Sequence, residues 1–290
     1  MLDPRIRLVN SVLTKSDHLR FKERKFDFPE IESLRDLSYD EAKAGDPDST
    51  LDVFWPKGRK DALPVMINIH GGGFVYGDKK LNQWTSAEIA SRGYIVFSLN
   101  YPLIPDTTIP EQVAAIERAF LFIDGLDERL PMDKSRVFLS GDSAGGLLAI
   151  RAAAIRNKEG GGTDSHVKKP SFTFRGLALI HPMIDINRRD FLAYTKKYYT
   201  AQGKRLKQPI ELAPLLPPVW IVSSRNDVAF NKEARMFVRT MRRIGKSVEY
   251  HEFPFTTKRP LLHIFMVTMN TLHESQRLYD SLDKFMKSLV

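Results

Sequence analysis

Two glycine-rich segments of this 290-residue chain combine residue types that support acyl-transfer chemistry. Residues 141–146 read Gly-Asp-Ser-Ala-Gly-Gly after an apolar run, which fits a G-x-S-x-G turn that exposes a serine between a strand and a helix. Residues 70–74 read His-Gly-Gly-Gly-Phe, also after an apolar run, and fit the companion loop whose backbone N–H groups bind an oxyanion. The order and placement of the two motifs predict a nucleophile, Ser143, with a donor loop upstream of it.

The small residues of both motifs have distinct predicted tasks. Gly141 and Gly145 permit a sharp turn with close packing, and the helix that follows favours developing negative charge near Ser143. Consecutive glycines let backbone N–H groups point at one place, and each such donor is worth about 3 kcal/mol in a transition state. The predicted oxyanion donors are the N–H groups of Gly72, Gly73 and Ala144. Three more residues are expected to support the motifs, and the first of them to brace its loop: His70, Gly71 and Asp142.

A serine hydroxyl is a weak nucleophile and needs a base, which in this motif class is a histidine that follows an acid in the chain. The histidines after Ser143 are His166, His181, His251, His263 and His273. His263 is the predicted base, because it lies in a loop between the last predicted strand and the final helix. His251 is the second candidate, although the pleat of that strand fixes its direction. His181 ends an earlier strand, before a proline.

The acid should follow the strand predicted over residues 219–223. Asp227 is the carboxylate just beyond it, where it would fix the tautomer of the base and stabilise the imidazolium. Glu233 is the fallback, and Asp185 comes one strand too early.

The hydrophobic pattern predicts strands that alternate with helices, which favours an α/β fold with a doubly wound, mostly parallel sheet. We predict one domain over residues 1–290. The basic, aromatic stretch 186–214 interrupts the alternation, and we interpret it, together with residues 1–30, as a small helical cap. The predicted strands are 34–39, 50–55, 65–69, 94–99, 136–139, 174–180, 219–223 and 247–255. The predicted helices are 81–91, 109–122, 145–156, 232–244 and 272–289.

The composition narrows the class of protein. The chain has no cysteine, which excludes disulfides, thiolate metal sites and a cysteine nucleophile. No apolar run is long enough to span a membrane, and charges interrupt residues 1–20, so we expect a cytoplasmic protein without a signal peptide. The net charge of +9 is interpreted as a solvated basic face, since no nucleic-acid-binding motif is present. A homodimer is compatible with these features.

The motifs resemble those of α/β-hydrolases of the hormone-sensitive-lipase type, which pair His-Gly-Gly-Gly with Gly-Asp-Ser-Ala-Gly-Gly. The resemblance covers roughly residues 50–290 and includes residues 100–105. It implies the α/β-hydrolase fold, Ser143 as nucleophile, Asp227 as acid and His263 as base. It also implies hydrolysis of esters with short-to-medium acyl chains, with no cofactor and no metal. The chain departs from the family where Ile264 follows the base, a position usually held by glycine.

The sequence therefore predicts a serine carboxylesterase that acts on a small ester. An amidase, peptidase or lactonase on the same residues is an alternative, and so is a non-catalytic small-molecule receptor on this fold. A third alternative, a nucleic-acid binder, depends on the net charge alone. Arg188 and Arg189 belong to a basic stretch that would favour an anionic substrate.

Overall fold

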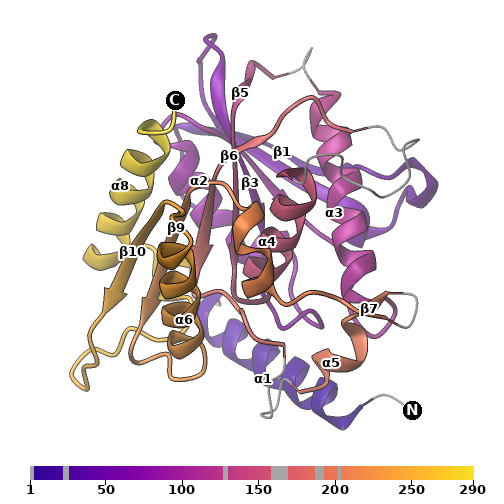
Figure 1. Ribbon diagram of the computed structural model, residues 1–290. Coiled ribbons are helices and arrows are strands. Elements are labelled where there is room, and N and C mark those ends of the chain that lie inside the picture. The colour runs from indigo at the N-terminus through magenta and orange to yellow at the C-terminus, as the bar shows by residue number, and fades with distance from the viewer. Residues whose placement is uncertain (1–2, 22–25, 127–129, 158–168, 187–192, 202–203) are drawn as a thin grey trace.

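The computed structural model describes residues 3–21, 26–126, 130–157, 169–186, 193–201 and 204–290. An eight-stranded sheet crosses the molecule in the order β1-β2-β4-β3-β5-β6-β9-β10 (Figure 1). Strands β1 and β2 pair antiparallel with their neighbours, and the other pairs are parallel. The mostly parallel sheet predicted from the sequence is confirmed. The strands are β1 (Ile31–Ser38), β2 (Thr50–Pro56), β3 (Leu63–Ile69), β4 (Ile95–Leu99), β5 (Met132–Asp142), β6 (Phe174–Ile180), β9 (Val219–Ser224) and β10 (Val248–Phe253).

Helices cover both faces of this sheet (Figure 1). Buried residues of α1, α3, α4 and α6 form one apolar cluster with the strands, and those of α2, α7 and α8 form a second. The helices are α1 (Pro4–Phe21), α2 (Gln83–Ala90), α3 (Ile109–Asp124), α4 (Ser143–Asn157), α5 (Thr195–Tyr198), α6 (Asn231–Arg243), α7 (Phe265–Thr268) and α8 (His273–Lys287). None of the helices in the described ranges is both long and apolar enough to cross a bilayer.

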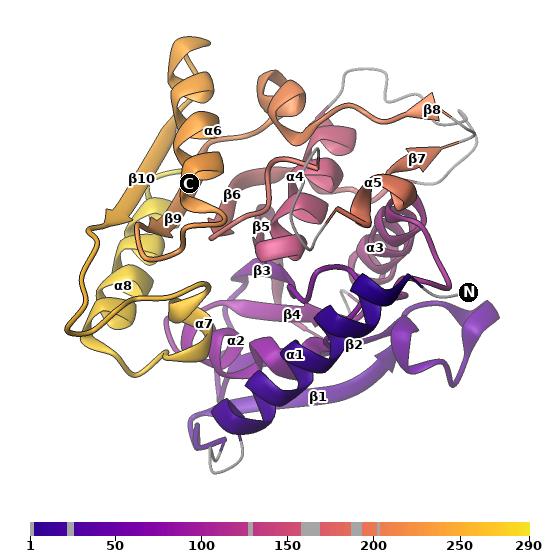
Figure 2. The ribbon, with the colours of Figure 1, turned by 90° about the horizontal axis from the view of Figure 1, so that it is seen from below.

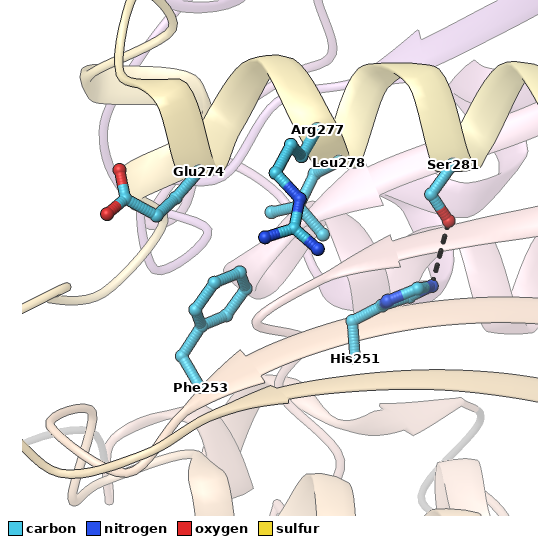
Figure 3. Close-up of a pocket in the computed structure, with 6 residues that line it drawn as sticks. All are labelled: His251, Phe253, Glu274, Arg277, Leu278 and Ser281. Carbon is cyan, nitrogen blue, oxygen red and sulfur yellow. Dashed lines mark hydrogen bonds between the residues drawn. The ribbon is translucent and has the colours of Figure 1, made fainter.

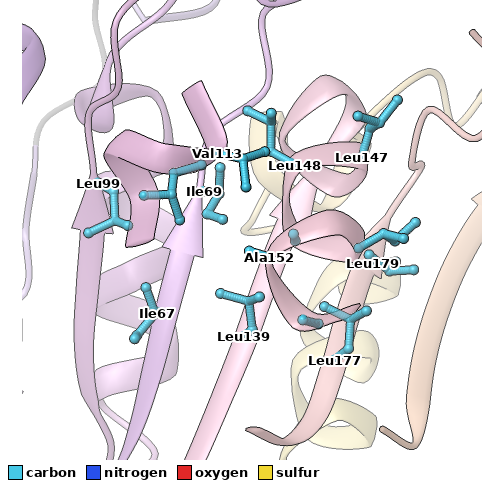
Figure 4. Packing of buried hydrophobic residues seen from close by; sticks show 14 of the residues in the cluster. Ile67, Ile69, Leu99, Val113, Leu139, Leu147, Leu148, Ala152, Leu177 and Leu179 are labelled. Atoms are coloured by element: carbon cyan, nitrogen blue, oxygen red, sulfur yellow. The ribbon is translucent and has the colours of Figure 1, made fainter. Parts of the chain in front are cut away.

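The central strands are apolar on both sides because helices pack on both sides of them. Leu139 and Leu177, from β5 and β6, belong to one apolar cluster with Leu148 and Ala152 of α4 (Figure 4). Burial of such side chains stabilises the fold by about 1.5–3 kcal/mol each. This packing holds α4, and with it the turn at Ser143, rigidly against the sheet.

The strand order brings the predicted site residues to one edge of the sheet. Strand β3 ends at the His-Gly-Gly-Gly loop and pairs with β5, which ends at the serine turn, so that Ile69 lies beside Gly141. Strand β6 lies between β5 and β9, and Asp227 follows β9. Carboxyl ends of parallel strands are where α/β sheets place their ligand sites.

The segment predicted as a cap is built from short elements within its described part. After α5 come a two-stranded ribbon, β7 (Thr200–Ala201) with β8 (Lys204–Arg205), and a 3₁₀ helix over Pro209–Leu215. In Figure 2, α1 crosses the molecule in front of the central strands, and α5 lies beyond its end. Arg188 and Arg189 lie outside the described residues.

Candidate active site

Ser143 occupies a sharp turn at the junction of β5 and α4. Its φ of 52° lies in the left-handed region, which costs a residue with a side chain about 1–2 kcal/mol. The flanking glycines make the turn sterically feasible: a Cβ on Gly141 would lie 2.4 Å from the Gly145 carbonyl oxygen, and one on Gly145 would lie 2.2 Å from that of Ile69. The strained backbone and the close packing match the serine turn expected from the motif.

A continuous hydrogen-bonded path connects Ser143 with a histidine and a carboxylate. His263 Nε2 lies 2.9 Å from Ser143 Oγ, and His263 Nδ1 lies 2.7 Å from Asp227 Oδ2. Because an ionised carboxylate only accepts, Nδ1 carries the proton, and Nε2 is left to accept the serine hydroxyl. The structure therefore brings together the three residues predicted as nucleophile, base and acid.

Asp227 is buried, and its Oδ2 atom has a second histidine partner. His181 Nδ1 lies 2.6 Å from the same oxygen that accepts the proton of His263. Burial opposes ionisation of this carboxyl, but the hydrogen bonds from His181 and His263 outweigh it and hold the pKa of Asp227 below its usual range. The carboxylate thus stays charged throughout the neutral pH range.

The sequence pattern predicts no catalytic role for His181, which ends a strand before Pro182. In the structure its side chain is fully buried, and its ring meets that of His263 edge to face. The order of the strands could have predicted the position of His181. It follows β6, which lies between the strand that ends at Ser143 and the strand that precedes Asp227.

Two neighbours constrain the ring of His263. Phe230 stacks on it with a centroid distance of 4.3 Å and an interplanar angle of 20°. The next residue, Ile264, has φ of 51°. A β-branched residue rarely adopts this conformation, and glycine, the usual family residue here, adopts it freely. The backbone at Ile264 therefore has a conformation that a glycine would adopt with less strain.

The His-Gly-Gly-Gly loop runs beside the serine. A Cβ on Gly71 would lie 3.1 Å from Ser143 Cβ and 2.4 Å from Asp142 Oδ2. The Gly71 carbonyl accepts from His70 Nδ1, and the Gly72 carbonyl accepts from two backbone N–H groups, three and four residues further along the chain.

 These two donors are the N–H groups of Val75 and Tyr76.

The direction of those carbonyls fixes the direction of the amides. In a trans peptide the C=O and N–H groups point in opposite directions, so the N–H groups of Gly72 and Gly73 point away from the partners of the two carbonyls. Gly72 has φ of 115°, and a Cβ there would lie 1.9 Å from the Tyr76 carbonyl oxygen. A side chain at this position would therefore displace the loop.

Two of the three supporting motif residues, His70 and Asp142, hold this loop through their side chains, and the third, Gly71, is part of its backbone. The ring of His70 is buried and stacks on Tyr101 at a centroid distance of 4.4 Å, and burial lowers its pKa to about 4. Asp142 accepts hydrogen bonds from Asn82 Nδ2 at 2.8 Å and from the Gly71 N–H, while burial raises its pKa to about 6. His70 and Asp142 thus hold the loop from two sides.

Both predicted cap segments contact the loop that follows β3. Tyr194 is buried and donates its hydroxyl to the Gly73 carbonyl at 2.6 Å. On α1, Asn10 Nδ2 donates to the Val75 carbonyl at 3.3 Å. These contacts connect the segments 1–30 and 186–214 to the candidate donor loop.

The other candidates lie elsewhere. His251 is on the edge strand β10, where it faces Ser281 of α8 and not Ser143 (Figure 3). Glu233 accepts from the backbone N–H groups of Ile184 and Asp185, so it holds the loop after β6. His166 lies outside the described residues.

His181, Asp227 and His263 also form a set of side chains of the kind that binds metal ions. Two ligands on a tetrahedral zinc ion are about 3.3 Å apart, because each metal–ligand bond is about 2.0–2.1 Å long. The two N···O distances here are 2.6 and 2.7 Å, which are hydrogen-bond distances and leave no room for an ion between the atoms. The residues fit a hydrogen-bonded cluster better than a metal centre.

The chain matches a family model and is similar in sequence to proteins named as hydrolases and carboxylesterases. Residues 51–226 match the family model described as BD-FAE. The chain is 25% identical over 218 residues to the putative alpha/beta hydrolase R526 of Acanthamoeba polyphaga mimivirus, covering 67% of this chain and 60% of that protein. It is 27% identical to carboxylesterase NlhH of Mycobacterium tuberculosis, covering 76% of this chain and 72% of that protein.

The fold is shared with a solved esterase. Esterase B from Lactobacillus rhamnosis superposes with a TM-score of 0.87 at 23% identity, covering 99% of this chain and 95% of that one. The present chain spans about three fifths of the length of the mimivirus relative, so the whole of that protein is not represented here.

Proposed function

We propose that this chain, which belongs to the BD-FAE family, is a serine carboxylesterase. In this proposal Ser143 is the nucleophile, His263 is the base and Asp227 is the acid. The family match confirms the resemblance to α/β-hydrolases of the hormone-sensitive-lipase type. The observation that carries the proposal is the path from Ser143 Oγ through His263 to Asp227, with distances of 2.9 and 2.7 Å.

In the first half-reaction, Ser143 Oγ attacks the ester carbonyl carbon while its proton moves to His263 Nε2. The carbonyl oxygen becomes an oxyanion, which the N–H groups of Gly72, Gly73 and Ala144 bind in this proposal. The intermediate collapses, the alcohol leaves with the proton from His263, and the acyl group remains on Ser143.

In the second half-reaction, water attacks the acyl carbon and gives one proton to His263 Nε2. The new intermediate expels Ser143 Oγ, which takes that proton, and the carboxylic acid is released. Asp227 keeps its negative charge throughout and stabilises the imidazolium at each step. No cofactor or metal enters this scheme.

The segments 1–30 and 186–214 act as cap elements in this proposal. Their support is the pair of contacts from Asn10 and Tyr194 to the loop that follows β3. We propose substrates that are small esters with short-to-medium acyl chains, the class implied by the family resemblance.

The test combines a covalent probe with a substrate series. A fluorophosphonate is expected to label Ser143, and p-nitrophenyl esters of increasing acyl length are expected to be hydrolysed, with both signals lost in Ser143→Ala. Full ester hydrolysis by that variant, with contaminants excluded, would overturn the proposal. Matched amides and lactones in the same series separate an amidase or a lactonase from an esterase, and ligand binding without turnover or labelling would indicate a receptor.

A further inference from the structure

We infer that His181 is a positioning residue for the proposed reaction, because its Nδ1–H group holds the Asp227 carboxylate in the orientation that serves His263. The inference rests on the proposed function, since it concerns the acid that orients the base. His181 does not contact the position of the substrate carbonyl in this scheme. It acts through Asp227.

The geometry shows a carboxylate oxygen shared by two rings. Asp227 Oδ2 lies 2.6 Å from His181 Nδ1 and 2.7 Å from His263 Nδ1. An oxygen of an ionised carboxylate has two lone pairs, so it accepts both protons. The two rings are close to perpendicular, with an interplanar angle of 88° and a centroid distance of 5.6 Å. A rotation of the carboxylate would break both hydrogen bonds at once.

The backbone fixes the place of His181 independently of its side chain. Its N–H donates to the Val222 carbonyl of β9 at 2.9 Å, and two residues later the Met183 N–H donates to the Ser143 carbonyl at 2.9 Å. Between these bonds the chain turns at His181, which has φ of 46°. The residue before a proline normally takes an extended conformation, so this turn is a strained one that the surroundings maintain.

The surroundings keep the ring neutral. Burial lowers the pKa of His181, although its hydrogen bond to Asp227 opposes this effect. Among the described residues, Nε2 of this ring is buried without a hydrogen-bond partner, so a proton there would have no acceptor. The titratable groups that face His181 are Asp227, from the loop after β9, and His263, from the loop before α7. Phe265 of α7 covers another side of the ring.

The second donor has a consequence for the base. Hydrogen bonds that stabilise a carboxylate reduce the additional stabilisation that it gives to an imidazolium. Removal of the His181 donor therefore has two effects. The productive orientation of the carboxylate is held less often, which lowers kcat, and in that orientation Asp227 is a stronger acceptor for protonated His263, which raises the pH at which the base becomes available. Asp142 also acts on His263 electrostatically, and it is unchanged by this substitution.

The experiment compares two substitutions in the full-length enzyme. His181→Phe keeps a planar ring but removes the donor, whereas His181→Asn places an amide N–H near the position of Nδ1. For H181F we expect kcat to fall about 10–100-fold, with KM changed less than about threefold, as is typical when a supporting partner is lost. We also expect the acidic limb of the kcat/KM profile to move to higher pH by about 0.5–1 unit. H181N should restore both quantities to near the wild-type values.

The result that overturns the inference is an H181F enzyme with wild-type kcat and an unshifted acidic limb. A fall in kcat without a shift of the limb, and without rescue by H181N, would indicate a role in packing alone and would also overturn it. If H181F does not fold, ¹⁵N-histidine NMR of the wild-type enzyme decides, since the inference requires the Nδ1–H tautomer of His181 and a neutral ring from about pH 8 to about pH 5. An Nε2–H tautomer, or titration in that range, would contradict it.

Failure of this inference is distinguishable from failure of the proposed function. A fluorophosphonate that labels Ser143 in the wild-type enzyme, together with an inactive Ser143→Ala variant, supports the function whatever H181F does. An active Ser143→Ala variant would remove the basis for both.

Discussion

Among the residues that the structure describes, two clusters contain a histidine within hydrogen-bond distance of both a serine and a carboxylate. In the first, the two nitrogens of His263 have different partners, Asp227 and Ser143. In the second, on β10 and α8, His251 Nε2 lies 2.7 Å from Glu249 Oε1 and 2.9 Å from Ser281 Oγ. Figure 3 shows the hydrogen bond between His251 and Ser281. A single nitrogen cannot both donate to an acid and accept from a serine. Ser281 Oγ instead donates directly to Glu249 Oε1 at 2.8 Å, so His251 does not relay a proton between the serine and the acid.

The carboxylates of the two clusters also differ, in how far each is exposed to solvent. The side chains of His263 and His251 are equally exposed, at 30%, but the side chain of Asp227 is 3% exposed and that of Glu249 is 43% exposed. A buried carboxylate stabilises a neighbouring imidazolium more strongly than one in water, because the effective dielectric constant is lower. The residue types alone therefore do not distinguish the two clusters, whereas the placement of the ring nitrogens and the burial of the carboxylate do.

The largest expected difference in kcat is between alanine substitutions of the two serines, Ser143 and Ser281. Ser143→Ala should lower kcat for a p-nitrophenyl ester by about 10⁶-fold, since it removes the nucleophile. Ser281→Ala should leave kcat unchanged and cost about 1 kcal/mol of unfolding free energy, because Trp220 Nε1 loses its acceptor. Steady-state kinetics and urea denaturation measure the two effects. Equal losses of activity in both variants would break the comparison.

Substitution of the two carboxylates, Asp227 and Glu249, should produce a smaller difference in kcat. Asp227→Asn should lower kcat by about 10⁴-fold at pH 7, because an amide no longer selects the tautomer of His263 with Nδ1 protonated. Glu249→Gln is the matched control, and we expect kcat within about twofold of the wild type. An Asp227→Asn enzyme that retains more than a tenth of the activity would argue against Asp227 as the acid.

The donor loop lies beside the first cluster only. Gly72→Ala should lower kcat by about 10²–10³-fold, the size expected for loss of one oxyanion donor, because the new Cβ would collide with the Tyr76 carbonyl. Gly45 also has a positive φ, of 89°, but a Cβ there meets nothing within 4 Å. Gly45→Ala therefore reports backbone strain without loop displacement, and its kcat should equal that of the wild type. Equal kcat values for both variants would contradict the assigned role of the loop.

The smallest expected effect concerns the contact between a cap segment and the donor loop. Tyr194→Phe removes the hydroxyl that binds the Gly73 carbonyl, and we expect kcat/KM to fall about threefold to tenfold, in line with a hydrogen bond worth about 1 kcal/mol. Tyr39→Phe is the control, because its buried hydroxyl also binds backbone carbonyls, at Asp48 and Asn100. Both variants should lose similar stability in thermal unfolding, but only Tyr194→Phe should lose activity.

Much of this arrangement could be predicted from the sequence because it depends on local patterns. The serine turn follows from two glycines around Ser143, and the places of Asp227 and His263 follow from the ends of predicted strands. The 174–180 strand has the predicted bounds, and β5 is longer than its apolar core suggested because polar residues at its start also pair with β3.

His181 could not be assigned from local pattern. The rule for residues before proline predicts an extended backbone there. Two hydrogen bonds hold it in the left-handed region instead, and their acceptors are the carbonyls of Val222 and Ser143. Those partners are distant in the sequence and become neighbours only when the strand order is known. The same is true of Tyr194, whose hydroxyl meets a carbonyl far upstream in the chain.

The stacking of Phe230 on His263 has a consequence for the second half of the proposed reaction. Once Ser143 carries an acyl group, its oxygen no longer offers a proton, and the imidazole loses one of the partners that hold it. Phe230 on one face, Asp227 at Nδ1 and the edge of His181 do not depend on that hydroxyl. The ring is therefore kept from flipping during the lifetime of the acyl-enzyme, and the incoming water meets a base that is already aimed at it.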